Sequence, residues 1–328
     1  MNAFDFAAPT TVEDAVKLLG VPDAEALSGG TDLLGRLKDY ASSPKRVVYL
    51  KDVKALAGIS GDATDGLTIG AGTRLADVLA DKAVKESYPA LWQATLEVGT
   101  PQIRNMATVG GNLLQRPRCW YYRAGNGLLA VKDGKSLVRE GDNRYHAIFE
   151  TDGDALFVNP SSLAVPLIAL GAKAVVAGPR GERTIAVEDL YQIPKSGKDS
   201  ELTLAPGEVV TKLVLPPAKG LNASYEARQK QAHDWPIVLA SVNLNLDDHK
   251  VASSRIVVYG VAPIPWRSKA AEEALAGKLL NPESAAAAAA ASIAAAKPLS
   301  MNAYKVGLTQ TVVKRALMVA MGNRYWEG

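Results

Sequence analysis

Two short segments of the 328-residue sequence combine adjacent glycines with small polar residues. They are Ser28-Gly29-Gly30-Thr31-Asp32 and Thr108-Val109-Gly110-Gly111-Asn112. Glycine has no Cβ, so it adopts positive φ easily and lets a ligand approach the main chain closely. Consecutive backbone amides in such a bend form a concave site for an anion. The side chains of Thr31, Thr108 and Asn112 add neutral donors, which suits a pyrophosphate held without many lysines.

Either segment alone is also compatible with an ordinary tight turn, because turns use glycine constantly. No lysine follows either glycine pair, so neither segment is a Walker A phosphate loop. Neither matches G-x-G-x-x-G, so a Rossmann dinucleotide site is not indicated. Two such steps, each after an apolar strand, favour an anion site without excluding two unrelated turns.

The elements that must position these glycines have a mixed α and β pattern. Thr11 is a typical helix N-cap, and the apolar residues that follow it share one helix face. Apolar runs rich in β-branched residues predict strands around both glycine segments. The predicted helices cover 11–19, 74–82 and 88–98, with another beginning at Ser161 or Ser162. The predicted strands cover 24–27, 46–50, 67–73, 155–159, 172–178, 183–190 and 208–216.

The character of the chain changes after the proline- and glycine-containing stretch at 216–220. Residues 223–230, 237–247 and 251–262 predict a three-stranded antiparallel meander. Asn281 followed by Pro282 is a strong helix start, and the alanine run at 285–291 favours a helix over disorder. A last helix is predicted over about 301–321.

Composition and charge exclude several classes of protein. The net charge of +3 is small for this length, and no run of lysine and arginine indicates a nucleic-acid surface. The N-terminus has no basic region typical of a signal peptide, and no stretch is apolar enough for a membrane span. Cys119 is the only cysteine, which excludes an intrachain disulfide. We expect a cytoplasmic protein that binds neither nucleic acid nor membrane.

Several segments together resemble one family. "LSGGTDLL" (27–34) and "ATVGGNLLQ" (107–115) are similar to the two FAD-binding motifs in the flavoprotein subunits of molybdenum hydroxylases, a family that includes xanthine dehydrogenase, carbon monoxide dehydrogenase and bacterial aldehyde oxidoreductases. "IGAGTRL" at 69–75 and "EVVTKLVLP" at 208–216 extend the resemblance over essentially the whole chain. Within this family, the sequence most resembles the bacterial aldehyde oxidoreductase branch.

The resemblance implies an α+β fold with a vanillyl-alcohol-oxidase-type FAD-binding domain. Its two subdomains are expected at 1–60 and 61–218, the second with an insertion at 115–150. A C-terminal domain at 219–328 is expected to hold the three-stranded antiparallel sheet and a helical bundle. The FAD pyrophosphate is then expected between the two glycine segments, with Gly110 and Gly111 bare so that the backbone touches phosphate oxygens. Gly111→Val is expected to abolish flavin uptake.

The resemblance also implies the cofactor-binding residues, and no catalytic or metal-binding residue is expected in this chain. From the first segment they are Ala26, Leu27, Ser28, Gly29, Gly30, Thr31, Asp32 and Leu33. From the second they are Ala107, Thr108, Gly110, Gly111 and Asn112, with Arg118 and Lys230 added from elsewhere. Arg118 is interpreted either as a phosphate ligand or as half of a salt bridge, and Lys230 either as a cation near the isoalloxazine or as a solvated charge.

The insertion has a more specific implication. Some members of the aldehyde oxidoreductase branch carry a [4Fe–4S] cluster here, and such a cluster needs four cysteines. Because Cys119 stands alone, no iron–sulfur cluster is predicted in this chain. The aromatic residues after Cys119 either shield the flavin, face a partner or simply pack, and His146 is interpreted as a structural histidine or one near the cofactor.

The function implied is that of the FAD-carrying electron-transfer subunit of a heterotrimer. A large partner holds the molybdenum cofactor and oxidises an aldehyde or heterocycle, and a small partner passes electrons through [2Fe–2S] clusters to FAD, from which an external acceptor takes them. Alternatives are a standalone FAD-dependent oxidoreductase of the same fold and a scaffold subunit that has lost flavin. A partner's signal would make the complex periplasmic by co-export.

Overall fold

The computed structural model describes residues 1–325 and begins with a small parallel sheet. Its strand order is β1-β3-β2, with both neighbouring pairs parallel. Thr11 accepts a hydrogen bond from the amide of Asp14, which starts the first helix as predicted. The elements are β1 (Asp5–Ala7), α1 (Val12–Leu19), β2 (Ala24–Leu27), α2 (Leu33–Lys38) and β3 (Arg46–Tyr49).

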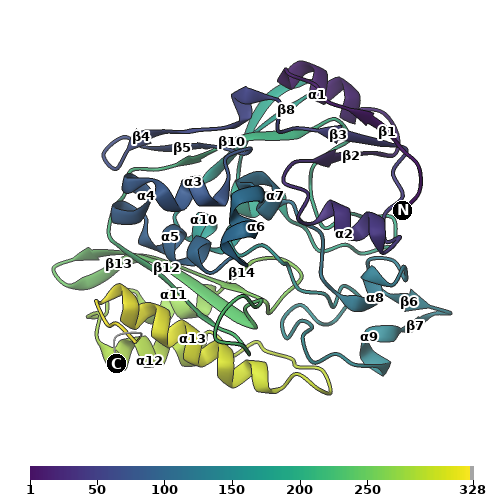
Figure 1. Cartoon of the computed structure of the whole chain (residues 1–328). Helices are drawn as coiled ribbons and strands as arrows, with labels where there is room; N and C mark the ends of the chain where they lie inside the picture. The colour runs from purple at the N-terminus through teal and green to yellow at the C-terminus, as the bar shows by residue number, and fades with distance from the viewer. Residues whose placement is uncertain (326–328) are drawn as a thin grey trace.

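A second, antiparallel sheet of five strands follows, in the order β4-β5-β10-β8-β9. Figure 1 shows a layer of helices packed beneath it, between this sheet and the C-terminal one. The strands are β4 (Ile59–Asp62), β5 (Gly66–Gly70), β8 (Lys173–Gly178), β9 (Gly181–Ala186) and β10 (Val209–Leu215). The helices are α3 (Leu75–Ala80), α4 (Lys82–Ser87), α5 (Pro89–Leu96), α6 (Pro101–Met106), α7 (Val109–Leu113) and α10 (Ala164–Ala169), with single 3₁₀ turns η1 (Lys54–Leu56) and η2 (Val187–Leu190).

The C-terminal part is an antiparallel sheet covered by helices. The three predicted strands form, and a two-residue strand adds a fourth, giving the order β11-β12-β13-β14. Asn281 and Ser284 form a capping box at the start of α12, in agreement with the sequence signal. The elements are β11 (Leu221–Ala227), β12 (Val238–Asp247), β13 (Lys250–Tyr259), β14 (Trp266–Arg267), α11 (Lys269–Leu275), α12 (Pro282–Ala291) and α13 (Tyr304–Ala320).

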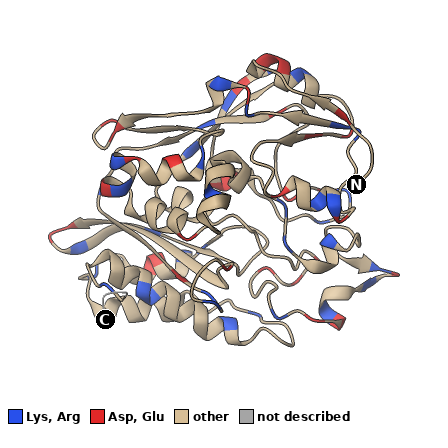
Figure 2. Ribbon diagram, in the orientation of Figure 1, with Lys and Arg blue, Asp and Glu red and all other residues tan. Residues whose placement is uncertain are grey.

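The 115–150 segment is mostly irregular and lies to the side of the stacked layers (Figure 1). It contains only short elements, namely α8 (Trp120–Arg123), β6 (Val131–Lys132), β7 (Lys135–Ser136) and α9 (Leu137–Glu140). Blue and red residues are interspersed over the ribbon in Figure 2, without a single-sign stripe in that view. None of the described helices combines the length and apolar character that a membrane span requires.

Two predicted strands were wrong. The second glycine segment was expected to follow an apolar strand, but it follows helix α6. Residues 155–159 are buried but form no strand; instead, the carbonyl of Leu156 accepts from Ala147 and the amide of Asn159 donates to Ala262. The apolar run therefore signalled burial, which a short sequence pattern does not distinguish from strand pairing.

Candidate functional site

The first glycine segment is an open loop between β2 and α2. Gly30 adopts a φ of +75°, in the left-handed region that favours glycine. A Cβ placed on Gly29 would lie 2.1 Å from the carbonyl oxygen of Met106, so this glycine permits direct contact between the two glycine segments. Within the described chain, the amides of Gly29, Gly30 and Thr31 donate to no protein acceptor. They are therefore available to a ligand.

The second glycine segment differs from the bend expected from the sequence, because it is the first turn of helix α7. Thr108 is its N-cap, and its Oγ1 accepts from the amide of Gly111 at 3.2 Å. The amide of Gly110 donates to the carbonyl of Ala71 at 2.7 Å, and a Cβ on Gly110 would lie 3.0 Å from Ala71. The expectation of bare amides at Gly110 and Gly111 was thus wrong for this structure: Gly110 allows close packing, and Gly111 is exposed.

The two segments nevertheless meet, although 80 residues separate them. The hydroxyl of Thr108 donates to Ser28 Oγ at 2.9 Å. Gly29 also lies against Met106, just before α7. The loop after β2 and the start of α7 are therefore in direct contact. The open amides of the first segment lie beside the Ser28 hydroxyl, whose proton is free because Thr108 donates to its oxygen; this donor set suits phosphate oxygens.

The outer residues of the predicted binding segments have other roles. Leu33 is buried with Leu37 and Val47, and Leu27 packs against that cluster. Ala107 is buried, and its carbonyl accepts from Leu75. Ala26 is an exposed residue of β2. Leu27, Leu33 and Ala107 hold the elements that carry the loops, and contacts of these residues and Ala26 with FAD stay predictions.

Asn112 is buried and ties α7 to the segment before α10. Its Oδ1 accepts from the hydroxyl of Ser161 at 3.0 Å and from the amide of Leu163 at 3.1 Å. Ser161 in turn accepts from the amide of Ala164, consistent with its predicted role at a helix start. The side-chain oxygen of Asn112 is committed to these bonds, so the residue positions α7.

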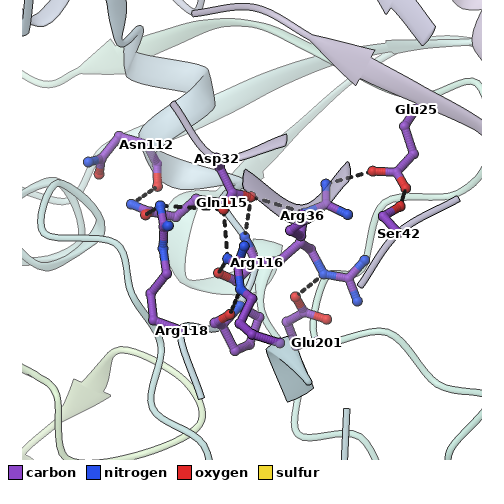
Figure 3. A network of polar contacts seen from close by, with 11 residues as sticks. Glu25, Asp32, Arg36, Ser42, Asn112, Gln115, Arg116, Arg118 and Glu201 are labelled. Carbon is purple, nitrogen blue, oxygen red and sulfur yellow. Dashed lines mark hydrogen bonds and ion pairs between the residues drawn. The ribbon is translucent and has the colours of Figure 1, made fainter. Parts of the chain in front are cut away.

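Asp32 joins the first glycine loop to the insertion. Its carboxylate lies 2.7 Å from Arg123 and 3.3 Å from both Arg118 and Arg36, and it accepts from the amide of Arg116. Figure 3 shows this network, which continues from Arg36 to Glu25 and from Arg116 to Glu201. Burial by itself raises the pKa of Asp32, but Arg118 and Arg123 outweigh it and lower that pKa below its ordinary value. Of the two interpretations given for Arg118, the structure shows the salt bridge, and a contact with phosphate stays a prediction.

A cavity of about 380 Å³ begins on the other side of Arg118. It lies where the insertion, the 157–160 segment, the β11–β12 loop and the end of β13 meet. Trp235 of the β11–β12 loop stacks on the Arg118 guanidinium, whose Cζ lies 4.8 Å from the centre of the tryptophan ring. Lys230 of the same loop is exposed and is not among the cavity-lining residues; its amide donates to Asp234.

Cys119 and His146 also line this cavity. The thiol lies 3.2 Å from His146 Nε2, and burial raises the pKa of Cys119. Burial, together with the charge of Lys305, lowers the pKa of His146 to about 4, so its imidazole is neutral near pH 7. Lys305 is itself buried and donates to the carbonyls of Tyr145, His146 and Gly260. No three histidine, cysteine or carboxylate side chains within residues 1–325 group closely enough to hold a metal ion.

Sequence reasoning missed Tyr259 and Lys305, which line the cavity from β13 and α13. Neither stands in a motif, and each reaches the site only because distant elements pack together. The one available signal was Tyr259 followed by Gly260 at the end of a predicted strand.

Comparison with known proteins assigns nearly the whole chain to two family models. Residues 2–218 match the model of the FAD-binding domain in molybdopterin dehydrogenase, and residues 223–320 match that of the CO dehydrogenase flavoprotein C-terminal domain. The chain is 31% identical to the aldehyde oxidoreductase FAD-binding subunit PaoB of Escherichia coli, over 98% of this chain and 99% of that one.

Two further comparisons agree. The carbon monoxide dehydrogenase medium chain of Hydrogenophaga pseudoflava is 28% identical, over 97% of this chain and 96% of that one. A solved structure of carbon monoxide dehydrogenase from the same organism superimposes with a TM-score of 0.76 at 27% identity, covering 98% of each chain. With family models matching nearly its full length, the chain belongs to the FAD-binding subunits of the molybdenum hydroxylases, a family of oxidoreductases.

Proposed function

We propose that this chain is the FAD-carrying electron-transfer subunit of a molybdenum hydroxylase that oxidises an aldehyde or a heterocycle. The observation that carries the proposal is the junction of the two glycine segments. The Thr108–Ser28 hydrogen bond and the contact of Gly29 with Met106 bring them together beside open backbone amides.

The residues at this junction fit the pyrophosphate of FAD. A Cβ at Gly29 would force the two segments apart, and the amides of Gly29, Gly30 and Thr31 have no protein acceptor within residues 1–325. In the proposal these amides and the hydroxyl of Ser28 hold the phosphates, and Thr108 orients Ser28 by donating to its Oγ. The arginines around Asp32 add positive charge nearby without displacing the amides.

Bound FAD would accept electrons and deliver them to an external acceptor. This chain's own part is to bind and orient the flavin and to exclude water, and we assign it no residue that oxidises the organic substrate. The relatives are named as FAD-binding subunits or medium chains. By that likeness we propose a large partner with the molybdenum cofactor and a small partner with [2Fe–2S] clusters, assembled in the cytoplasm unless a partner's signal exports the complex.

The test is to purify the chain alone and together with its partners. Released FAD, identified by mass, is expected in both preparations. An aldehyde or heterocycle is expected to reduce the flavin only when the partners are present. The loss of the flavin's visible absorbance measures this reduction. Steady turnover by the isolated chain would instead support a standalone oxidoreductase, and a colourless complex that takes up no FAD would contradict both.

A further inference from the structure

The cavity beside Arg118 is built for a flat aromatic ligand. Aromatic side chains from four parts of the chain line it, namely Trp120, Tyr145, Phe157, Trp235 and Tyr259. Its volume of about 380 Å³ falls in the range typical of small-molecule sites. Mostly apolar walls with a few polar groups bind planar conjugated rings and fix their orientation.

The Tyr259 hydroxyl and Arg118 Nε are among the cavity's donors that have no protein acceptor within residues 1–325. Tyr259 is 5% exposed, yet its hydroxyl has no hydrogen-bond partner within residues 1–325. The buried Tyr88 and Tyr191 differ, because their hydroxyls donate to the carbonyls of Pro216 and Leu113. Arg118 Nε is also buried without a partner, while the other end of the guanidinium contacts Asp32. A buried donor left unpaired costs free energy, so Arg118 Nε favours a ligand that accepts hydrogen bonds, and the Tyr259 hydroxyl is open to the same ligand.

The tyrosine hydroxyl keeps its proton. Burial and the carboxyl of Glu226 raise the pKa of Tyr259, and the opposing effect of Arg118 is smaller. Tyr259 is therefore a neutral donor at any physiological pH. Arg118 is a permanent cation at these pH values, so the pair presents one neutral donor and one charged donor.

The cavity is connected to the proposed phosphate site through a single side chain. Arg118 lines the cavity and lies 3.3 Å from Asp32, which directly follows the open amides of the first glycine loop. A ligand whose phosphates rest on that loop would reach the cavity with its next segment. The aromatic pocket and the phosphate cradle therefore share the Arg118–Asp32 contact, as expected if one ligand carries both a ring and a pyrophosphate.

We propose that Tyr259 and Arg118 are positioning residues for the isoalloxazine ring, to which they donate hydrogen bonds at its carbonyl edge. This inference rests on the proposed function. The carbonyl edge gains negative charge when the ring is reduced, so a tyrosine hydroxyl and a guanidinium there stabilise the reduced form more than the oxidised one. The pair would thus bind the ring and raise its midpoint potential.

Fragments of FAD test this with the full-length apoprotein. ADP carries the pyrophosphate without the flavin ring, and riboflavin carries the ring without the pyrophosphate. In Tyr259→Phe, which removes only the hydroxyl, riboflavin affinity and FAD affinity are expected to fall by about threefold to tenfold. ADP affinity is expected to stay within about twofold, because its site is the glycine loop. The midpoint potential of bound FAD is expected to become more negative.

Tyr88→Phe is the matched control, since Tyr88 is equally buried but does not line this cavity. It should leave riboflavin affinity, FAD affinity and potential at wild-type values. If Tyr259→Phe leaves both the riboflavin affinity and the potential of bound FAD unchanged, the inference about Tyr259 is overturned, while ADP competition with FAD would still support the proposed function. If neither ADP nor FAD binds the wild-type chain, the proposed function itself fails.

Discussion

The two glycine segments share a Gly-Gly step followed by a polar residue, but their structures differ. Residues 28–32 form an open loop in which Gly30 has positive φ and three successive amides have no acceptor within the described chain. Residues 108–112 are a capped helix start in which the amides of Gly110 and Gly111 are already bonded. A Gly-Gly-polar step therefore does not specify one conformation, because the residues that contact each glycine decide its use.

Gly29 and Gly111 also differ in the atoms that an added Cβ would meet. Gly29 keeps space for a backbone carbonyl of the other segment, whereas a Cβ on Gly111 would meet only the Thr108 hydroxyl, at 2.9 Å. We therefore expect substitutions at Gly29 to disturb the fold and the ligand site together. Substitutions at Gly111 should disturb the ligand site alone. Four predictions follow this comparison in order of their effect on the free energy of unfolding.

The largest effect is expected for Gly29→Ala. Its Cβ would overlap the Met106 carbonyl, so the two segments must separate, with a loss of about 3 kcal/mol in the free energy of unfolding. FAD affinity should fall by about a hundredfold or more. Gly35→Ala in α2 is the control, since a Cβ there meets nothing within 4 Å. Denaturant unfolding and FAD titration measure both quantities, and a stable Gly29→Ala protein with normal FAD affinity would contradict the predicted contact.

Asp32→Asn should destabilise the fold by a similar amount, with a smaller effect expected on FAD binding. It leaves Arg118, Arg123 and Arg36 without their shared carboxylate, and the expected loss is about 3 kcal/mol at pH 7. Because the folded state lowers the pKa of Asp32, its contribution is present above the unfolded-state pKa and disappears as pH falls through the folded value.

The difference between wild type and Asp32→Asn should therefore shrink in acid. Urea unfolding at pH 7 and at successively lower pH checks this. Asp77→Asn, which removes an exposed pair with Arg74, should cost far less. A difference that stays constant down to strongly acidic pH would show that charge pairing is not the cause.

Thr108→Val should have an intermediate effect of about 1–2 kcal/mol, because it removes both the cap of α7 and the bond to Ser28. Thr11→Val removes a similar cap from α1, and the Thr11 side chain bonds with Asp14 instead of with either glycine segment. The two variants should lose similar stability, but only Thr108→Val should bind FAD more weakly. Equal FAD affinity in both would mean that the Thr108–Ser28 bond does not shape the cofactor site.

Gly111→Ala should have the smallest effect on stability, within about 1 kcal/mol, since the gain in helix propensity offsets the contact with Thr108. FAD affinity should nevertheless fall by about tenfold, because the family resemblance places the exposed Gly111 among the FAD-binding residues and the new methyl group would obstruct the ligand. Thermal unfolding and FAD titration separate the two effects. If Gly111→Ala binds FAD with wild-type affinity, Gly111 is not part of the FAD site. The stronger effect expected for Gly111→Val would then be contradicted as well.

Local signals were sufficient where a few neighbouring residues decide the structure. The caps at Thr11 and Asn281 were predicted because a side-chain oxygen satisfies an amide three residues away, within the same segment. The strands around residues 46–50 and 67–73 were predicted because their apolar residues must be buried. The pairing of the two glycine motifs came from family resemblance, and their spacing alone would not have distinguished a cofactor site from two turns.

Tertiary structure alone decided which groups are free to bind. Asp32 meets Arg118 and Arg123 across more than 80 residues of sequence, and Tyr259 reaches the cavity from a strand of the C-terminal sheet. The apolar run at 155–159 packs as buried coil, and the Tyr259 hydroxyl has no hydrogen-bond partner in the described chain. The sequence by itself determined the elements and the family. The choice between a bonded amide and an open one depends on contacts between distant segments, which no local pattern encodes.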